Sequence, residues 1–343
     1  MQENNSNSNK FSSTPTKWVV LSTALFFTFL IAYLVLSSTA NLSLTSQSEN
    51  EPASRPLILL YLKGDESQKQ LHQYDFSNGS NLALDVFLQG ESPDSLVWRD
   101  KNHVLFVSAQ QDFIELNLES GKAIVLQSHQ RSLFRKYRSM VGSLDWCSGI
   151  ERFVVTGTGV SPDFGWVEIL NSSGELDETV SNRSGYMDIA CSPDSSSVAV
   201  VDTINSGGLV SVLGNTPLPQ VTENEDIFLT IVSLADGEST RLTQDGFVIQ
   251  PNWSPDGSQI AFVGQFKTDA YETQIYLINL DTKEREVLTS FEDANLATPV
   301  WSPDGKMIAF VKDGDIWLIQ IETGEITQVT ETPEEESAPV WHP

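Results

Sequence analysis

Carboxylates that recur at a fixed spacing are the first candidates for chemistry in this chain. Asp256 and Asp304 lie 48 residues apart, each inside the same five letters, WSPDG, which begin at Trp253 and Trp301. Two carboxylates held close together can act as general acid and base. Ser-Pro-Asp-Gly is also the composition of a type I turn followed by a left-handed residue. We therefore predict that these aspartates shape turns and do not act in catalysis.

The histidines and serines show no catalytic arrangement. The chain has four histidines, at His72, His103, His129 and His342. They lack the close spacing of metal ligands, so no histidine-based metal site is expected. A Gly-x-Ser-x-Gly nucleophile motif is also missing from the sequence. We predict no enzymatic activity and no cofactor.

The charge balance excludes one large class of partners. The 343 residues include 46 acidic and 20 basic side chains, a formal net charge of −26. Nucleic-acid binding needs clustered Lys and Arg to replace phosphate counterions, so it is excluded on electrostatic grounds. An acidic run at 223–226 offers oxygen ligands for Ca²⁺, although a solvated loop is the more ordinary interpretation in so acidic a chain.

The turns belong to a repeat that runs through most of the chain. Its copies begin at Trp98, Trp146, Cys191, Trp253 and Trp301, and Trp341 begins a last, partial one. The spacings of 48, 45, 62, 48 and 40 residues suit propeller blades, which take about 40–50 residues and several short strands each. We predict that these anchors lie on the innermost strands of successive blades.

The two ends of the repeat region complement each other. Residues 56–87 contain three strand-like runs and lack an innermost strand, whereas the final APVWHP supplies an innermost strand alone. Joining them completes a sixth blade and removes open sheet edges. The expected fold is all-β: a six-bladed propeller of four-stranded blades over residues 56–343, closed by the C-terminal strand and preceded by one transmembrane helix.

The motif WSPDG-x-x-I-A-F-V, followed by DIWLIQIETGEITQVT, resembles the WD40-like, PD40-type repeat of TolB and its relatives. Residues 248–289 and 296–330 are the strong copies, and weaker copies extend the resemblance to about 94–343. The resemblance implies a six-bladed propeller. It specifies a fold far better than a function, because TolB-like propellers also include lyases with histidine-rich metal sites.

Residues 18–38 form a long apolar stretch ahead of the propeller, and no charge appears after it until Glu49. About 20 apolar residues suffice to cross a bilayer as a helix. We predict an uncleaved signal anchor, with cleavage after Ala40 as the alternative.

The flanks of this stretch set its orientation. Lys10 and Lys17 precede it, which favours a cytoplasmic tail at 1–17. Residues 39–55 are rich in Ser, Asn and Glu and indicate a flexible linker. The propeller is therefore expected in the periplasm or outside the cell.

Cys147 and Cys191 fall on the predicted innermost strands of neighbouring blades. We expect two buried free thiols, because small apolar environments suit unpaired cysteine. A disulfide is the alternative in an oxidising compartment.

The loops carry the strongest functional signal. In a four-stranded blade, the connections between strands two and three, and between strand four and the next blade, emerge on one face. That face should collect the insertion at 204–226, the segments 157–166 and 265–274, and a basic connection at 129–140. Loop-borne Arg beside aromatic residues is enriched at protein-binding hot spots. The candidate partner-binding residues are Arg131, Phe134, Arg135, Lys136, Tyr137, Arg138, Phe164, Trp166, Leu213, Leu218, Phe266 and Tyr271.

A milder interpretation of the basic connection is that its side chains pair with the molecule's own carboxylates. The expected function is a membrane-anchored, extracytoplasmic, non-enzymatic protein-binding or scaffold module of the cell envelope. One alternative is a receptor or enzyme with a sugar or peptide site at the central mouth of the ring. Another is a purely structural part of a larger envelope complex.

Overall fold

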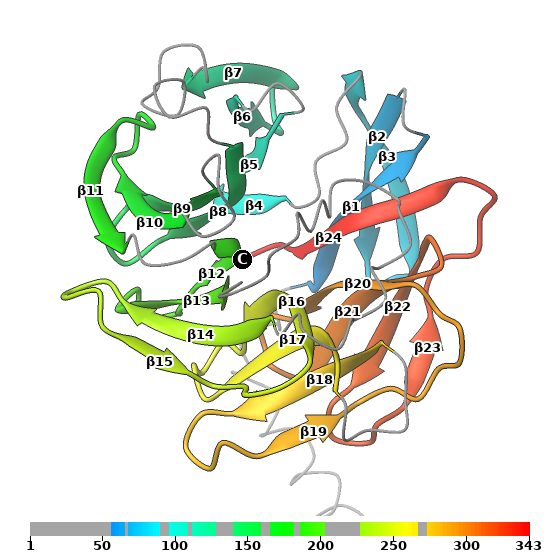
Figure 1. Cartoon of the computed structure of the whole chain (residues 1–343). Helices are drawn as coiled ribbons and strands as arrows, with labels where there is room; N and C mark the ends of the chain where they lie inside the picture. Colours follow the sequence, from blue (N-terminus) through cyan, green and yellow to red (C-terminus); the bar gives the residue numbers. More distant parts are fainter. Residues whose placement is uncertain are drawn as a thin grey trace, which may run out of the picture. The chain divides into compact units, whose positions relative to one another are not determined.

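The computed structural model describes residues 56–65, 68–89, 96–108, 112–127, 140–158, 165–181, 186–202, 227–266 and 273–343. The chain divides into two units, Met1–Arg55 and Pro56–Pro343, and every described residue lies in the second. These residues form six antiparallel sheets of four strands each, which Figure 1 shows arranged as blades of a ring. The predicted six-bladed propeller is confirmed.

The predicted cytoplasmic tail, signal anchor and linker lie outside the described residues. Across the described ranges, no helix is long and apolar enough to span a membrane.

The first three blades are built from the N-terminal half of the propeller and the C-terminal strand β24. Blade 1 contains β24 (Glu335–Trp341), β1 (Ile58–Gly64), β2 (Gln68–Asp75) and β3 (Ser80–Gln89). Blade 2 contains β4 (Val97–Asp100), β5 (His103–Val107), β6 (Phe113–Asn117) and β7 (Lys122–Gln127). Blade 3 contains β8 (Met140–Cys147), β9 (Arg152–Thr158), β10 (Gly165–Leu170) and β11 (Leu176–Ser181).

The other three blades follow in chain order. Blade 4 contains β12 (Tyr186–Cys191), β13 (Ser197–Asp202), β14 (Phe228–Ser233) and β15 (Ser239–Arg241). Blade 5 contains β16 (Phe247–Trp253), β17 (Gln259–Gln265), β18 (Gln274–Asn279) and β19 (Arg285–Val287). Blade 6 contains β20 (Leu296–Trp301), β21 (Met307–Lys312), β22 (Asp315–Gln320) and β23 (Ile326–Gln328).

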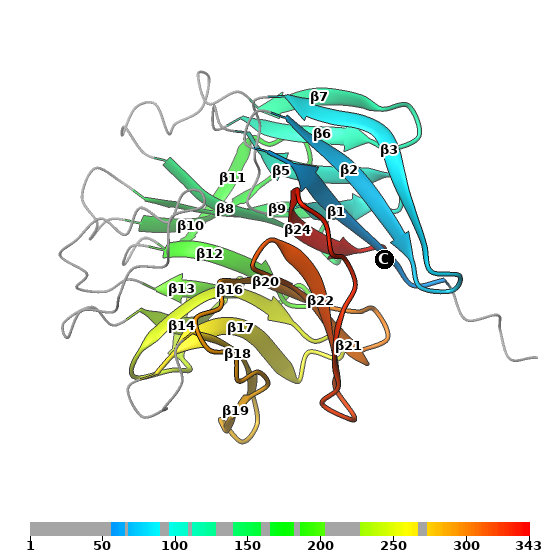
Figure 2. The same cartoon turned by 90° about the vertical axis from the view of Figure 1, so that its right-hand side faces the viewer.

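Blade 1 closes the ring with strands from both ends of the propeller. The C-terminal β24 pairs antiparallel with β1, and the register places Leu59 opposite Trp341 and Leu60 opposite Val340. Figure 2 shows the red β24 beside the blue β1. The closure expected from the sequence is therefore confirmed.

The core lies between blades. On β17, Ala261, Phe262 and Val263 are all 0 % exposed, so both faces of this strand are covered. The rings of Phe262 and Tyr276 stack with their centroids 5.8 Å apart, next to Val248 of the innermost strand. Strands buried on both faces explain why runs such as AFV are continuously apolar.

The SPDG segments form the predicted turns. Gly257 N donates to Ser254 O at 2.9 Å, and Gly257 has a φ of +73°, which favours glycine. Ser254 Oγ and Ser258 N donate to Asp256 Oδ1 at 2.6 and 3.0 Å. These hydrogen bonds hold the pKa of Asp256 below its ordinary value.

Cys147 and Cys191 form a disulfide, with their Cα atoms 5.6 Å apart. The expectation of two free thiols is wrong, and the alternative pairing is correct. Strands β8 and β12 are innermost in adjacent blades, and their last residues lie within disulfide range.

Candidate functional site

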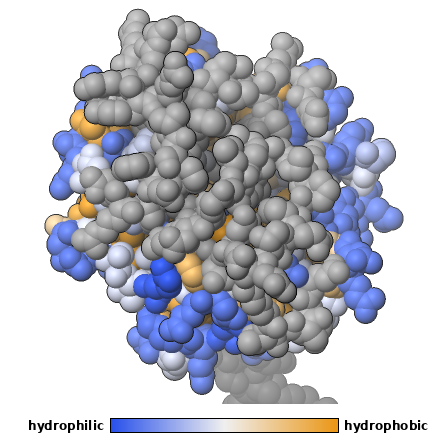
Figure 3. Space-filling view, viewed as in Figure 1, coloured by the Kyte–Doolittle hydropathy of each residue, from blue (hydrophilic) through white to orange (hydrophobic). Residues whose placement is uncertain are grey.

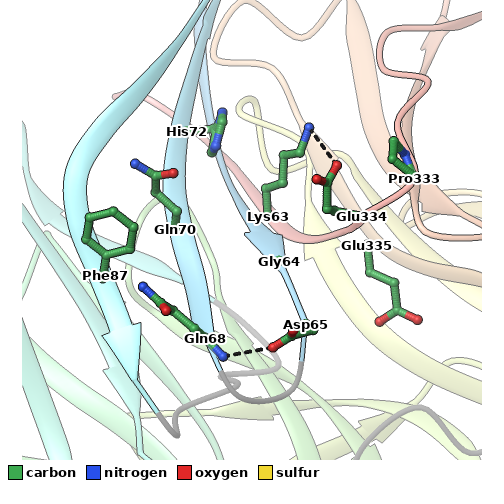
Figure 4. Close-up of a pocket in the computed structure, with 10 residues that line it drawn as sticks. All are labelled: Lys63, Gly64, Asp65, Gln68, Gln70, His72, Phe87, Pro333, Glu334 and Glu335. Carbon is green, nitrogen blue, oxygen red and sulfur yellow. Dashed lines mark hydrogen bonds and ion pairs between the residues drawn. The ribbon is translucent and has the colours of Figure 1, made fainter.

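A cleft of about 560 Å³ lies where blade 1 meets blade 6, at the seam of the ring. Lys63 and Gly64 at the end of β1 and Asp65 just after it line the cleft, and Gln68, Gln70 and His72 contribute from β2. Phe87 of β3 and residues 333–335 complete the lining. We call this site the seam cleft. Figure 4 shows Phe87 and Gln70 on one side, Glu334 and Glu335 on the other, and Lys63 between them.

Strand periodicity explains why these side chains converge. Gln68, Gln70 and His72 are two residues apart on β2 and share one face. The register places Lys63 and Phe87 opposite Gln70, one on each neighbouring strand. This face of blade 1 turns toward blade 6, whose outermost strand, β23, has 3 residues against the 10 of β3. The short β23 leaves part of the face without a facing strand.

Lys63 pairs with two glutamates, Glu334 just before β24 and Glu336 on β24. Its Nζ lies 3.4 Å from Glu334 Oε2 and 3.8 Å from Glu336 Oε1. Glu336 is 1 % exposed and also accepts hydrogen bonds from the hydroxyls of Thr330 and Thr332. A buried carboxylate with several donors is fixed in place, so this network helps to hold the Lys63 side chain at the cleft.

The imidazole of His72 belongs to a second network of contacts, with Tyr61 and Asn81. It stacks on the Tyr61 ring at 5.5 Å, and its Nδ1 lies 3.4 Å from Asn81 Oδ1. Asn81 Nδ2 in turn donates to the Tyr61 hydroxyl at 2.6 Å. Burial raises the pKa of Tyr61 to about 12, so this hydroxyl stays protonated at neutral pH.

The lining is suited to binding a polar or cationic group beside an aromatic ring. Asp65 and Glu335 are exposed carboxylates, and Asp65 Oδ1 accepts a hydrogen bond from Gln68 N at 3.1 Å. Lys63 is paired with Glu334. Phe87 is 47 % exposed and offers a ring face to an alkyl chain or a cation. Its neighbours Gln68 and Gln70 add amide groups.

Most predicted partner-binding residues lie outside the described part of the chain. These are Arg131, Phe134, Arg135, Lys136, Tyr137, Arg138, Phe164, Leu213, Leu218 and Tyr271. The acidic run at 223–226 also lies outside it, so the structure does not test these predictions.

Two predicted partner-binding residues are described, and both belong to the packing of the blades. Phe266 is 2 % exposed, and the Arg285 guanidinium lies 3.4 Å from its ring centroid. Its burial removes it from any surface that a partner could touch, which corrects the sequence-based assignment. Trp166 lies on β10 and not in a loop, half-buried against the core of blades 2 and 3.

Gly157 makes room for the Trp166 indole. A Cβ at Gly157 would approach Trp166 Cζ2 to 2.3 Å, so a larger residue would displace the ring. Segment 157–166, expected to be a functional loop, therefore includes strand positions with a packing role at both ends.

Among the described residues, no group of three or more His, Cys, Asp or Glu is arranged to hold a metal ion. His103 pairs with Asp100 at 2.8 Å, and His342 stacks edge-on against Trp98. Neither lines the seam cleft, where His72 is the sole histidine of the lining.

Sequence reasoning missed the seam cleft. The residues of its two sides lie about 250 positions apart in the chain, so no local motif joins them. One signal was present: Gln68, Gln70 and His72 put polar side chains on one face of a strand that a propeller would otherwise bury on both sides.

Residues 218–343 match the family model described as the TolB beta propeller domain. No curated protein matches this sequence. Among solved structures, TolB from Acinetobacter baumannii is 16% identical with a TM-score of 0.63, and the match covers 83% of this chain and 66% of that one. A putative TolB from Agrobacterium tumefaciens is 15% identical with a TM-score of 0.58, covering 84% and 99%. The nidogen/laminin complex matches at 9% identity and a TM-score of 0.60, covering 83% and 98%.

The class of fold is thus a closed six-bladed β-propeller with four antiparallel strands in each blade. Its repeats and its architecture are TolB-like, as the family match and the two TolB structures agree. At these identities the solved structures establish the fold alone.

Proposed function

We propose that this protein is a non-enzymatic protein-binding or scaffold module of the cell envelope. In this proposal residues 18–38 anchor it in a membrane and the propeller lies outside the cytoplasm. The seam cleft carries the proposal, because it combines an exposed aromatic ring with exposed carboxylates at the margin of a rigid, closed ring. Aromatic groups on a rigid scaffold are typical anchors of protein interfaces.

Three further observations support a place outside the cytoplasm. The disulfide between Cys147 and Cys191 favours an oxidising compartment, since disulfides are rare in the cytosol. The TolB-like propeller is also consistent with an envelope protein. Where described residues are visible in Figure 3, the rim is mostly hydrophilic, as suits a domain surrounded by water.

Site-specific crosslinking in native membranes tests this function. The full chain would carry a photo-crosslinking amino acid in place of Phe87, in the seam cleft, or in place of Glu322, on an exposed turn outside it. We expect a discrete adduct from position 87 and a weaker or absent one from position 322.

Adducts of equal yield at both positions, or none at either, would contradict a binding role for the seam cleft. Extraction of the same membranes tests whether residues 18–38 act as an anchor. We expect the full chain to resist extraction by alkaline carbonate, and a chain lacking residues 18–38 to be released. Release of the full chain would argue against the anchor and leave the binding result standing.

A further inference from the structure

One face of blade 1 is covered along only part of its length. Alternate residues of β1, among them Leu59, Tyr61 and Lys63, lie on this face. Leu59 and Tyr61 are 0 % exposed and share a core cluster with Ala309 and Leu318 of blade 6. Lys63, further along the strand, lines the seam cleft. The cleft is therefore the uncovered end of a face that is otherwise packed against the neighbouring blade.

The two strands beneath the cleft are paired along both edges. Strand β1 pairs with β24 and β2, and β2 pairs with β1 and β3. A ligand in the cleft therefore meets side chains and not a row of backbone N–H and C=O groups. This arrangement disfavours an extended peptide, whose affinity in strand addition comes from backbone hydrogen bonds.

Two of the lining side chains present hydrogen-bond acceptors in fixed positions. Gln70 Nε2 donates to Leu84 O at 2.9 Å, which leaves its Oε1 to accept. Asn81 Nδ2 donates to the Tyr61 hydroxyl, so Asn81 Oδ1 faces His72 Nδ1 at 3.4 Å. In the neutral imidazole Nδ1 then carries the proton and Nε2 accepts. The cleft thus suits a ligand with several hydroxyl donors.

Phe87 supplies an apolar contact beside these acceptors. Its ring is 47 % exposed, and the register places it opposite Gln70, with Cβ atoms of such pairs about 5 Å apart. His72 is the next residue after Gln70 on the same face of β2. The face of an aromatic ring is electronegative and attracts the polarised C–H groups of a sugar ring. Acceptors for hydroxyl groups therefore lie next to a platform for C–H groups.

The charges of the lining favour an uncharged ligand. The lining contains three carboxylates, on Asp65, Glu334 and Glu335, and one ammonium group, on Lys63. The excess of negative charge opposes an anionic ligand. Figure 4 shows Lys63 between the two sides of the cleft, where its ammonium group opposes a second cation. A neutral molecule with many hydroxyl groups avoids both penalties.

We propose that the seam cleft binds an uncharged oligosaccharide of the cell envelope. One sugar ring lies against Phe87, and its hydroxyl groups donate to Gln70 and His72. The volume of about 560 Å³ falls in the range of about 300–1,000 Å³ that small-ligand sites occupy, which suits a short stretch of glycan. This inference rests on the proposed function, since it names the chemistry of the group that the same cleft recognises.

Isothermal titration of the full chain, in micelles of a detergent without a sugar headgroup, tests the proposal. The ligands are cellotriose, maltotriose and triacetylchitotriose. Cellotriose and maltotriose oxidised to carboxylates at their primary alcohols are the matched anionic ligands. We expect at least one neutral trisaccharide to bind, and oxidation to weaken the binding of cellotriose or maltotriose about tenfold or more, because the new carboxylates meet those of the cleft. Absence of binding by all three neutral trisaccharides would overturn the inference.

Matched variants locate the site. Phe87→Ala should weaken the neutral trisaccharide about fivefold or more, whereas Phe87→Tyr, which keeps the ring, should bind as the unaltered chain does. His72→Phe removes the Nε2 acceptor, keeps a ring against Tyr61, and should also weaken binding about fivefold. Leu82→Ala is the control, because Leu82 is 57 % exposed on the same strand as Phe87 and outside the lining. Equal losses for Leu82→Ala and Phe87→Ala would overturn the assignment to the cleft.

Crosslinking in native membranes separates this inference from the proposed function. The amino acid at position 87 carries an aromatic ketone as its photoreactive group, which keeps a ring at the site. Mass spectrometry of the crosslinked peptide identifies the captured molecule. Sugar units on a partner peptide would support both proposals, and sugar units alone would support the oligosaccharide and contradict a protein partner. A captured peptide without sugar would overturn the oligosaccharide and leave the protein-binding function standing.

Discussion

At the residue scale, Asp145 joins two blades through its carboxylate. Its oxygens accept hydrogen bonds from Cys191 N in blade 4 and from its neighbour Trp146 N, each at 2.7 Å. Burial raises the pKa of Asp145 to about 6, because the ionised form loses hydration, although the two N–H donors oppose this shift. The carboxylate therefore holds its proton more tightly in the folded chain than in the unfolded one.

This shift gives a pH dependence of known sign. The ordinary pKa is 3.8, so the stabilising contribution of the protonated form is complete below about pH 4 and is lost as the pH rises toward 6. We expect Asp145→Asn to remove this dependence. The free energy of unfolding of the variant, minus that of the unaltered chain, should rise by up to about 3 kcal/mol between pH 4 and pH 6.

Urea unfolding at several pH values measures this difference. Asp281→Asn, on an exposed turn, corrects for the loss of one negative charge. A difference for Asp145→Asn that stays constant across the window would show that the carboxylate does not change its protonation there.

At the element scale, the anchor tryptophans connect the innermost strands. Trp253 Nε1 donates to Ala190 O and Trp341 Nε1 donates to Val300 O, each at 3.0 Å and each to the preceding blade. Trp301 differs, since its Nε1 has no hydrogen-bond partner among the described residues. Trp341 and Trp301 are therefore both buried tryptophans, but Trp341 makes a hydrogen bond to the preceding blade through its Nε1 and Trp301 does not.

This contrast predicts unequal costs for the same substitution. Trp341→Phe removes an inter-blade hydrogen bond, whereas Trp301→Phe removes an indole N–H that donates to no described atom. Both side chains are buried, at 5 % and 7 % exposure, so the lost apolar area is similar. We expect Trp341→Phe to lower the free energy of unfolding by about 1 kcal/mol more than Trp301→Phe does.

Chemical denaturation of the two variants under one condition gives the comparison. Equal losses would mean that the indole anchors act through packing alone.

The elements also show how far sequence reasoning reaches. Regular anchors such as Trp253 and Trp301 predicted the innermost strands, because each repeat carries its own turn and apolar run. Contacts between segments far apart in the chain were harder to predict. Whether Cys147 meets Cys191 depends on the distance between adjacent blades, which a period along the chain does not encode. Whether Phe87 and Glu335 line one cleft depends on the pairing of β24 with β1, which joins segments far apart in the chain. Phe266 was misassigned for a different reason: it follows β17 directly in a loop-like sequence, which hid its packing against Arg285 of the same blade.

At the scale of the whole molecule, a strand pairing and a disulfide join different parts of the ring. Pairing of β24 with β1 closes blade 1 without a covalent bond. The disulfide between Cys147 and Cys191 links blades 3 and 4, across the ring from the boundary between blades 6 and 1. Because the noncovalent closure already limits how far blades can separate, the disulfide acts mainly on the unfolded chain, where it closes a loop between residues 44 apart.

Removing the disulfide should therefore lower stability without changing the fold. A loop of this length corresponds to about 4 kcal/mol in the chain-entropy estimate, and measured losses typically fall between about 2 and 4 kcal/mol. We expect the double variant Cys147→Ala, Cys191→Ala to unfold at a lower urea concentration and to keep the β-sheet circular dichroism spectrum. Dithiothreitol should shift the unaltered chain to the same midpoint and leave the double variant where it is. If the midpoint of the unaltered chain does not move once thiol titration shows full reduction, the ring alone holds blades 3 and 4 together, and the disulfide adds nothing to the stability of the propeller.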